Sequence, residues 1–187
     1  MTLPKIGDMI SPYKFGLLNA ALRTHPPVTN HNATHDAKSG NAKWVGKTLH
    51  IAAEGLINYW YIPPIDDEVS YCVVHDKGGY GDAYVISDGF GGCEYHTLSN
   101  AKFGLTAFLH VYRGGGITTK YTLADGWIRT RILSSDGMTK ANGSHKRDHM
   151  VVSHIDRTNN TVKSKFISTE FDAKLRVSTV WMEFSEI

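Results

Sequence analysis

Short stretches in which apolar and polar residues alternate recur along most of the chain after residue 44. A period of two is typical of β-strands that bury one face, and Asp-Gly, Asn-Gly and Asn-Asn pairs between the later stretches are typical of tight turns. The pattern therefore predicts a mainly antiparallel β-protein. The stretches are 56–62, 69–75, 83–86, 106–113, 118–123, 126–133, 150–155, 162–169 and 174–184.

The N-terminal part has a different pattern. Residues 11–22 begin with Ser-Pro and carry apolar residues at roughly helical spacing, which predicts a short amphipathic helix. Residues 23–43 are rich in Asn, Thr, Pro and Gly and predict a polar loop. We expect one domain over 1–187, with the helix and loop in 1–43 and a mainly β core in 44–187. The predicted fold class is α+β, mainly antiparallel β, with a β-sandwich core and a few peripheral helices.

Three connections complete this picture. The stretches 69–75 and 83–86 flank a glycine-rich turn and predict a hairpin. Residues 94–103 are polar and predict a loop or arm. Residues 134–148 are polar and basic and predict a mobile loop, whose charges would either be solvated or meet an acidic partner.

Composition narrows the class of protein. The chain of 187 residues can bury a sizeable core, and 41% hydrophobic with 20% charged residues is typical of a soluble globular domain. A net charge of +2 is too small to argue for nucleic acid. The N-terminus has no long apolar run, so we expect no ordinary signal peptide and no membrane span. The expected location is the cytoplasm, or a host cell reached by a specialised secretion system.

A glycine-rich turn delivers a cysteine directly after the predicted strand 83–86. Residues 87–93 read Ser-Asp-Gly-Phe-Gly-Gly-Cys, and a later apolar stretch carries His110. A thiol becomes a nucleophile as thiolate, and an imidazole is the usual acceptor of its proton. Ser87 is a candidate for orienting that imidazole. Gly91 and Gly92 are candidates for binding an oxyanion, because glycines leave backbone N–H groups uncovered.

Other interpretations of these residues stay open at this point. His96 is the rival base, although its place in a predicted loop favours His110. Cys93 could be a buried structural thiol or could form a disulfide with Cys72. His31 and His35 have a spacing that suits a metal on a helix, but the Pro- and Asn-rich surroundings favour a solvated loop. We therefore expect neither a metal nor a cofactor.

The segment from Ser87 to His110 resembles the cysteine-dependent glutamine deamidases that share the fold of the cytotoxic necrotizing factor catalytic domain. This group includes the chemoreceptor deamidases and Burkholderia lethal factor. The resemblance puts the family's nucleophile on Cys93, its base on His110 and its orienting hydroxyl on Ser87, where threonine is usual. Asp88 stands where an apolar residue is common. The match covers about thirty of the 187 residues.

The resemblance implies a protein-glutamine deamidase that converts a glutamine side chain of a target protein to glutamate without a cofactor. The toxin members of the family imply a bacterial effector acting on a host regulatory protein. The same pair of residues would serve transglutamination or a Cys-His peptidase. A different class, a non-catalytic β-sandwich binding protein with aromatic anchors, is also compatible with the sequence. The sequence leaves the oligomeric state open.

Overall fold

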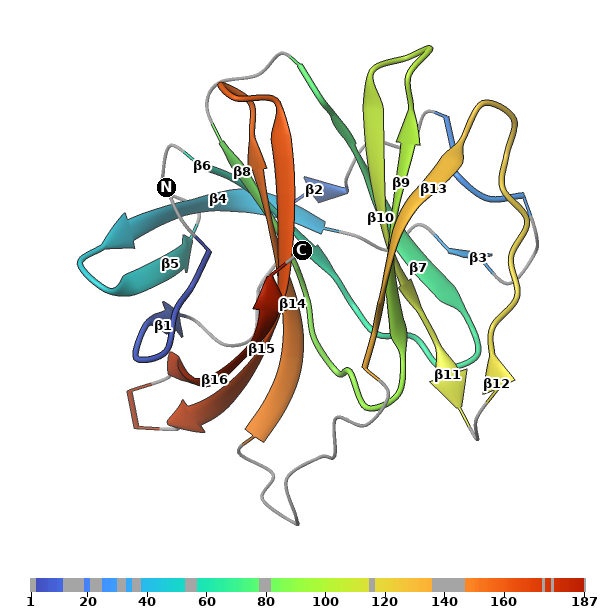
Figure 1. The fold of residues 1–187 in the computed structure, drawn as a ribbon. Coiled ribbons are helices and arrows are strands. Elements are labelled where there is room, and N and C mark those ends of the chain that lie inside the picture. Colours follow the sequence, from blue (N-terminus) through green and yellow to red (C-terminus); the bar gives the residue numbers. More distant parts are fainter. Residues whose placement is uncertain are drawn as a thin grey trace.

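A computed structural model describes residues 3–11, 19–20, 25–29, 33–34, 38–52, 57–77, 82–114, 117–135, 147–172, 174–175 and 177–186. Within these ranges the chain forms strands and turns and no helix (Figure 1). The strands are β1 (Met9–Ser11), β2 (Asn19–Ala20), β3 (Ala33–Thr34), β4 (Lys38–Val45), β5 (Thr48–Ala52), β6 (Ile57–Ile62), β7 (Val69–His75), β8 (Ala83–Ser87), β9 (Glu94–Asn100), β10 (Leu105–Val111), β11 (Arg113–Gly114), β12 (Ile117–Thr118), β13 (Ile128–Ser134), β14 (Arg147–Asp156), β15 (Thr161–Asp172) and β16 (Val177–Glu186).

Eight strands close into a mixed β-barrel in the order β4-β5-β1-β16-β15-β14-β8-β6, and the pairing of β4 with β6 completes the ring. The pairs β1–β5 and β6–β8 are parallel, and the other neighbours in the ring are antiparallel. Closure pairs strand edges that would otherwise be open to other chains. An apolar cluster fills the barrel; its largest members include Tyr59, Tyr84, Leu49, Ile86 and Ile167.

A second sheet, in the order β13-β9-β10-β7-β3, stands beside the barrel (Figure 1). A buried apolar cluster joins the two layers, with Val151 and Phe166 from the barrel and Cys72, Tyr95 and Phe108 from the sheet. The opposite face of the sheet contributes to another apolar cluster. Val28, Trp127 and Tyr121, from irregular segments of the chain, pack against the sheet in this cluster. The functional residues considered below lie at the junction between barrel and sheet.

The predicted α+β fold with a β-sandwich core and peripheral helices is wrong. The described chain has no helix, and its larger sheet closes into a barrel. Alternation along a strand shows that one face is buried, but it does not show which strand lies alongside. The closing strand β4 also lies largely within residues predicted as a loop, because its sequence Lys-Ser-Gly-Asn-Ala-Lys is polar. Both β1 and β4 pair within the same barrel as the C-terminal half of the chain.

A helix was predicted over residues 11–22, but the residues of this segment that the structure describes belong to strands. Ser11 ends β1, and residues 19–20 form β2, paired with β4. The rest of this segment lies outside the described residues, as do 136–146 of the loop predicted at 134–148. At the two ends of that loop, Ser134 closes β13 and Arg147 opens β14.

Two predicted connections are also wrong. The strands β7 and β8 form no hairpin, because β7 pairs with β10 and β3 in the second sheet while β8 pairs with β14 and β6 in the barrel. Most of the polar segment 94–103 is strand β9, which forms a hairpin with β10. Its polar side chains His96, Thr97 and Asn100 are buried, so polarity was a poor guide to exposure there.

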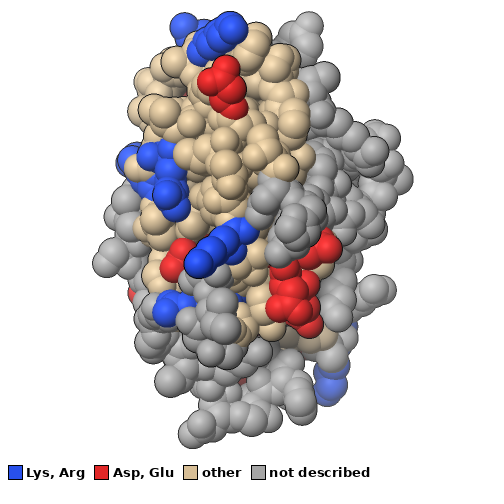
Figure 2. All heavy atoms as spheres, turned by 90° about the vertical axis from the view of Figure 1, so that its right-hand side faces the viewer, with Lys and Arg blue, Asp and Glu red and all other residues tan. Residues whose placement is uncertain are grey.

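Charged side chains of both signs lie on the surface. Figure 2 shows basic and acidic side chains in separate small groups on one face, and neither sign covers the described part of that face. In the part of the chain that the structure describes, no helix has the length and apolar character needed to span a membrane.

Candidate cysteine-histidine site

The turn over residues 88–93 carries the chain from the barrel to the second sheet. Ser87 is the last residue of β8 in the barrel, and Cys93 directly precedes β9 in the sheet. His110 lies on β10, the neighbour of β9. The fold therefore brings the hydroxyl, the thiol and the imidazole to the same junction between the two layers.

The Ser87 hydroxyl and the His110 ring are in direct contact. Ser87 Oγ lies 2.8 Å from His110 Nδ1, and both side chains are buried. Ser87 Oγ also donates a hydrogen bond of 2.7 Å to the backbone oxygen of Ile62. A hydroxyl has a single hydrogen, so Ser87 must accept from His110 Nδ1–H. The ring proton is thereby held at Nδ1, and Nε2 carries the free lone pair.

His110 Nε2 is the ring atom that the Ser87 contact leaves without a proton. It is buried and has no hydrogen-bond partner among the described residues. Burial lowers the pKa of His110 to about 3, so the ring is neutral near pH 7. The Phe90 ring stacks on the imidazole with centroids 4.2 Å apart. The hydrogen bond and the stack together hold a neutral base in a fixed orientation.

The side chain of Cys93 lies on the same face of the sheet as His110. His110 pairs with Tyr95, and Cys93 stands two positions before Tyr95, so Cys93 is a diagonal neighbour of His110. Such neighbours have Cα atoms about 7–8 Å apart, with side chains closer. Cys93 is 7% exposed, and its thiol is not hydrogen-bonded to Nε2. Hydrogen bonds between nucleophile and base often tighten only when substrate binds.

The turn before Cys93 is built on glycines and on one serine. Gly89 and Gly92 have backbone φ values of 74° and 112°, which residues other than glycine rarely adopt. The Gly92 N–H donates to Ser135 Oγ at 2.8 Å, and Ser135 Oγ donates to the Cys93 carbonyl oxygen at 2.6 Å. Sequence reasoning missed Ser135, since an isolated serine beside a polar segment carries no signal of its own.

The other backbone donors of this turn are partly engaged. The Gly89 N–H donates to Asp148 Oδ1 at 3.3 Å, and the Phe90 N–H donates to the backbone oxygen of His149 at 3.2 Å. Because the Gly92 N–H is bonded to Ser135, the groups of this turn best suited to an oxyanion are those of Gly91 and Cys93.

His96 lies on the far face of the sheet from His110. His96 pairs with Leu109, whose side chain belongs to the apolar cluster on that far face. The ring nitrogens of His96 contact Glu94 Oε2 at 2.7 Å and Tyr121 Oη at 2.5 Å. A histidine held this way cannot reach the Cys93 thiol, so it is not the base for that residue.

Neighbouring groups also shape the site. Cys72 and Cys93 are both free thiols, and burial strongly raises the pKa of Cys72. The Asp88 carboxylate accepts a hydrogen bond of 2.7 Å from Tyr61 Oη. The carboxylate of Asp66 is the main cause that raises the pKa of Tyr112. Burial contributes next, followed by Asp67 and Cys93. Tyr112 thus lies within electrostatic reach of both the thiol and an acidic turn, which we call the acidic rim (residues 66–67).

The described part of the chain has no cluster of side chains suited to binding a metal ion. There, no group of three or more His, Cys, Asp or Glu side chains is placed to hold an ion. The two histidines considered as metal ligands from the sequence, His31 and His35, lie outside the described residues.

The sequence was compared with protein-family models and with curated proteins. No protein-family model and no curated protein matches this chain. The resemblance to the glutamine deamidases therefore rests on residues 87–110 alone.

Proposed function

We propose that the protein is a cysteine-dependent amidohydrolase that deamidates a glutamine side chain of a target protein. One observation carries this proposal: the hydrogen bonds from His110 Nδ1 to Ser87 and from Ser87 to Ile62 leave Nε2 unprotonated. The Nε2 atom has no other partner among the described residues and lies on the face of the sheet that bears Cys93. A neutral imidazole beside a thiol is the arrangement that nucleophilic thiol chemistry requires.

The reaction proceeds through a thioester. The Cys93 Sγ–H proton moves to His110 Nε2 as Sγ bonds to the carboxamide carbon, and the carbonyl oxygen becomes an oxyanion. The N–H groups of Gly91 and Cys93 stabilise this oxyanion. Collapse breaks the C–N bond, and ammonia leaves with the proton from Nε2. A water molecule then gives a proton to Nε2, attacks the thioester and releases glutamate with regeneration of the thiol.

The limited exposure of Cys93 favours a side-chain amide over a peptide bond. Only 7% of this residue is open to solvent, so the reacting amide must enter on a slender arm. A glutamine side chain extends its carboxamide beyond the backbone, whereas a peptide bond carries a side chain and chain continuation on both sides. We therefore favour deamidation over proteolysis.

The target is proposed to be a regulatory protein of a host cell, as for the toxin members of the family that residues 87–110 resemble. A reducing cytoplasm suits this activity, because the nucleophile must remain a free thiol. The acidic rim near Tyr112 favours a target whose glutamine has basic neighbours.

The test is deamidation itself. The protein is incubated with lysates or candidate regulatory proteins, and each glutamine is followed by mass spectrometry for replacement of its amide nitrogen by oxygen. Cys93→Ser and His110→Ala should abolish the change while circular dichroism shows an intact fold. Cleaved peptides in place of deamidated glutamine would show a peptidase. Full activity of Cys93→Ala would refute the proposal.

A further inference from the structure

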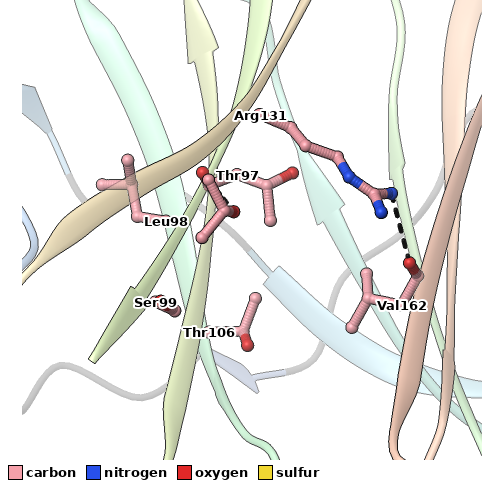
Figure 3. A pocket seen from close by; sticks show the side chains of 7 residues that line it. Thr97, Leu98, Ser99, Thr106, Arg131 and Val162 are labelled. Carbon is pink, nitrogen blue, oxygen red and sulfur yellow. Dashed lines mark hydrogen bonds between the residues drawn. The ribbon is translucent and has the colours of Figure 1, made fainter. Parts of the chain in front are cut away.

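A hollow opens at the junction between the barrel and the sheet, away from the turn that carries Cys93. It has a volume of about 200 Å³ and lies between β9, β10 and β13 of the sheet and β15 of the barrel (Figure 3). We call it the threonine pocket. Its walls are mostly hydroxyl-bearing side chains together with one guanidinium and two aliphatic residues. The lining residues are Thr97, Leu98, Ser99, Thr106, Thr130, Arg131 and Val162.

Arg131 is exposed and supplies a positive charge at the open side of the pocket. Its side chain reaches across the pocket from β13 toward β15 (Figure 3), where Nη1 donates a long bond of 3.4 Å to the Val162 carbonyl oxygen. No described carboxylate forms a salt bridge with this guanidinium. A guanidinium has five N–H donors, so most of its capacity is available to a ligand with a negative charge.

Two more hydroxyls line the same pocket. Thr97 and Ser99 stand on the same face of β9, and within the described chain neither hydroxyl has a protein partner. The other two hydroxyls are already engaged as donors. Thr130 Oγ1 donates to the Thr97 carbonyl oxygen at 2.9 Å, and Thr106 Oγ1 donates to Asp76 Oδ1 at 2.5 Å. The free donors therefore face the same space as the guanidinium.

We propose that the threonine pocket binds a small carboxylate with a short hydrocarbon part. A carboxylate matches one guanidinium fork bidentately and can accept from the hydroxyl of Thr97, which lies nearer to Arg131 than Ser99 does (Figure 3). The Val162 side chain and the threonine methyl groups would contact the hydrocarbon part. A phosphate dianion fits less well, because the lining has a single cation and the Asp76 carboxylate lies just behind Thr106.

This site is separate from the one around Cys93. Tyr95, Thr97 and Ser99 follow one another along one face of β9, and Cys93 directly precedes the strand. The fully buried Tyr95 therefore lies between the thiol and the pocket. The proposal therefore stands whether or not the protein is a deamidase.

The test is an NMR titration of the full chain with sodium propionate. Propionamide serves as the uncharged isostere and sodium phosphate as the second anion. Propionate should shift the backbone amides around Thr97, Ser99 and Arg131 in a saturable way, and propionamide should bind at least about tenfold more weakly. Stronger binding of phosphate than of propionate would contradict the choice of a carboxylate.

Two variants and one control complete the experiment. Arg131→Gln should weaken propionate binding about tenfold or more, and Thr97→Val, which keeps the side-chain shape, should weaken it less. Arg129→Gln removes the same charge from the same strand, but Arg129 lies over the Tyr121 ring on the other face, so binding should not change. Absence of saturable shifts in the wild type, or equal affinity in wild type, Arg131→Gln and Thr97→Val, would overturn the proposal.

Discussion

Ser87 accepts a hydrogen bond from His110, and the backbone carbonyl of Ile62 determines which of the two groups is the donor. The Ser87 hydroxyl gives its only hydrogen to the Ile62 carbonyl oxygen at 2.7 Å, so the 2.8 Å contact with Nδ1 must be donated by the ring. The serine thus fixes the tautomer of the histidine. Without it, the neutral ring could carry its proton on Nε2 and would then be unable to take a proton from a thiol.

Replacing Ser87 by alanine should therefore affect both activity and stability. The substitution removes the acceptor for His110 Nδ1–H and the donor for the Ile62 carbonyl oxygen. Each buried polar group left without a partner lowers the free energy of unfolding by about 1–3 kcal/mol. We expect kcat/KM to fall by about tenfold or more, with Ser87→Thr retaining most activity. Urea unfolding and the deamidation assay measure the two effects.

Ser153→Ala is the matched control for this substitution. Ser153 is a buried serine at the same layer boundary, but its hydroxyl bonds to Tyr95 Oη and Ser164 Oγ instead of a histidine. It should lose stability and keep activity. A Ser87→Ala protein with unchanged kcat/KM would show that the tautomer is set by something else.

Removal of the Ser135 hydroxyl should loosen the turn that holds the thiol. Ser135 accepts from Gly92 N–H and donates to the Cys93 carbonyl, so Ser135→Ala removes one contact to Gly92 and one to Cys93. We expect the free energy of unfolding to fall by about 1–3 kcal/mol and kcat to fall with little change in KM. Ser153→Ala again serves as the control. Unchanged kcat would limit Ser135 to a structural role.

The stability of the protein should fall in acid because of His110. The folded ring is protonated only near pH 3, whereas the ordinary histidine pKa is 6.5. Between these values the unfolded chain binds one more proton at this residue, so the free energy of unfolding drops as the pH drops. The loss is about 1.4 kcal/mol for each pH unit.

His110→Gln isolates this contribution. His96 also has a lowered pKa through burial and affects both proteins alike, so the difference in slope belongs to His110. Urea unfolding from pH 7 to pH 4 should give a shallower pH dependence for the variant. Identical slopes would mean that His110 has the same pKa in the folded and the unfolded protein.

The acidic rim should bias the choice of substrate. Asp66 and Asp67 act on the same Tyr112 hydroxyl as Cys93, so a target with lysines around its glutamine should react faster than one with glutamates. The double variant Asp66→Asn with Asp67→Asn should reduce this preference by about two- to tenfold, since exposed ion pairs are individually weak. Asparagine also tolerates the positive φ of 62° at Asp67.

Asp125→Asn removes a comparable exposed carboxylate outside the rim and should leave the preference unchanged. Competition between lysine-flanked and glutamate-flanked glutamine peptides measures the effect. A preference that the double variant keeps in full would assign it to contacts outside the rim.

The strands of the sheet were the most predictable feature. The predicted stretch 69–75 coincides with β7, and the C-terminal strands lie close to the predicted ones. Strand character depends on local alternation, which a sequence displays. Ser87, Cys93 and His110 were chosen together because thiol chemistry needs those residue types after a glycine turn and on a later strand. The structure brings Ser87 and His110 into contact, and the role of the three residues stays a proposal.

Features that depend on distant partners could not be predicted. The barrel closes through the pairing of β4 with β6, and the polar β4 pairs there because neighbouring strands supply its hydrogen bonds. The strand β9 was misjudged because its polar residues have buried partners, such as Glu94 and Tyr121 for His96. Ser135 touches the site only because β13 lies alongside β9, which no local pattern reveals.

The rate of Cys93 alkylation by iodoacetamide, compared between wild type and His110→Gln, tests the central claim most directly. Cys72 is the internal control, since it is fully buried and burial raises its pKa. With His110 Nε2 as the proposed base for Cys93, wild-type Cys93 should react at neutral pH well before Cys72, and His110→Gln should slow it about tenfold or more. Equal and slow reaction of Cys93 in both proteins would contradict the account and make Cys93 a structural thiol.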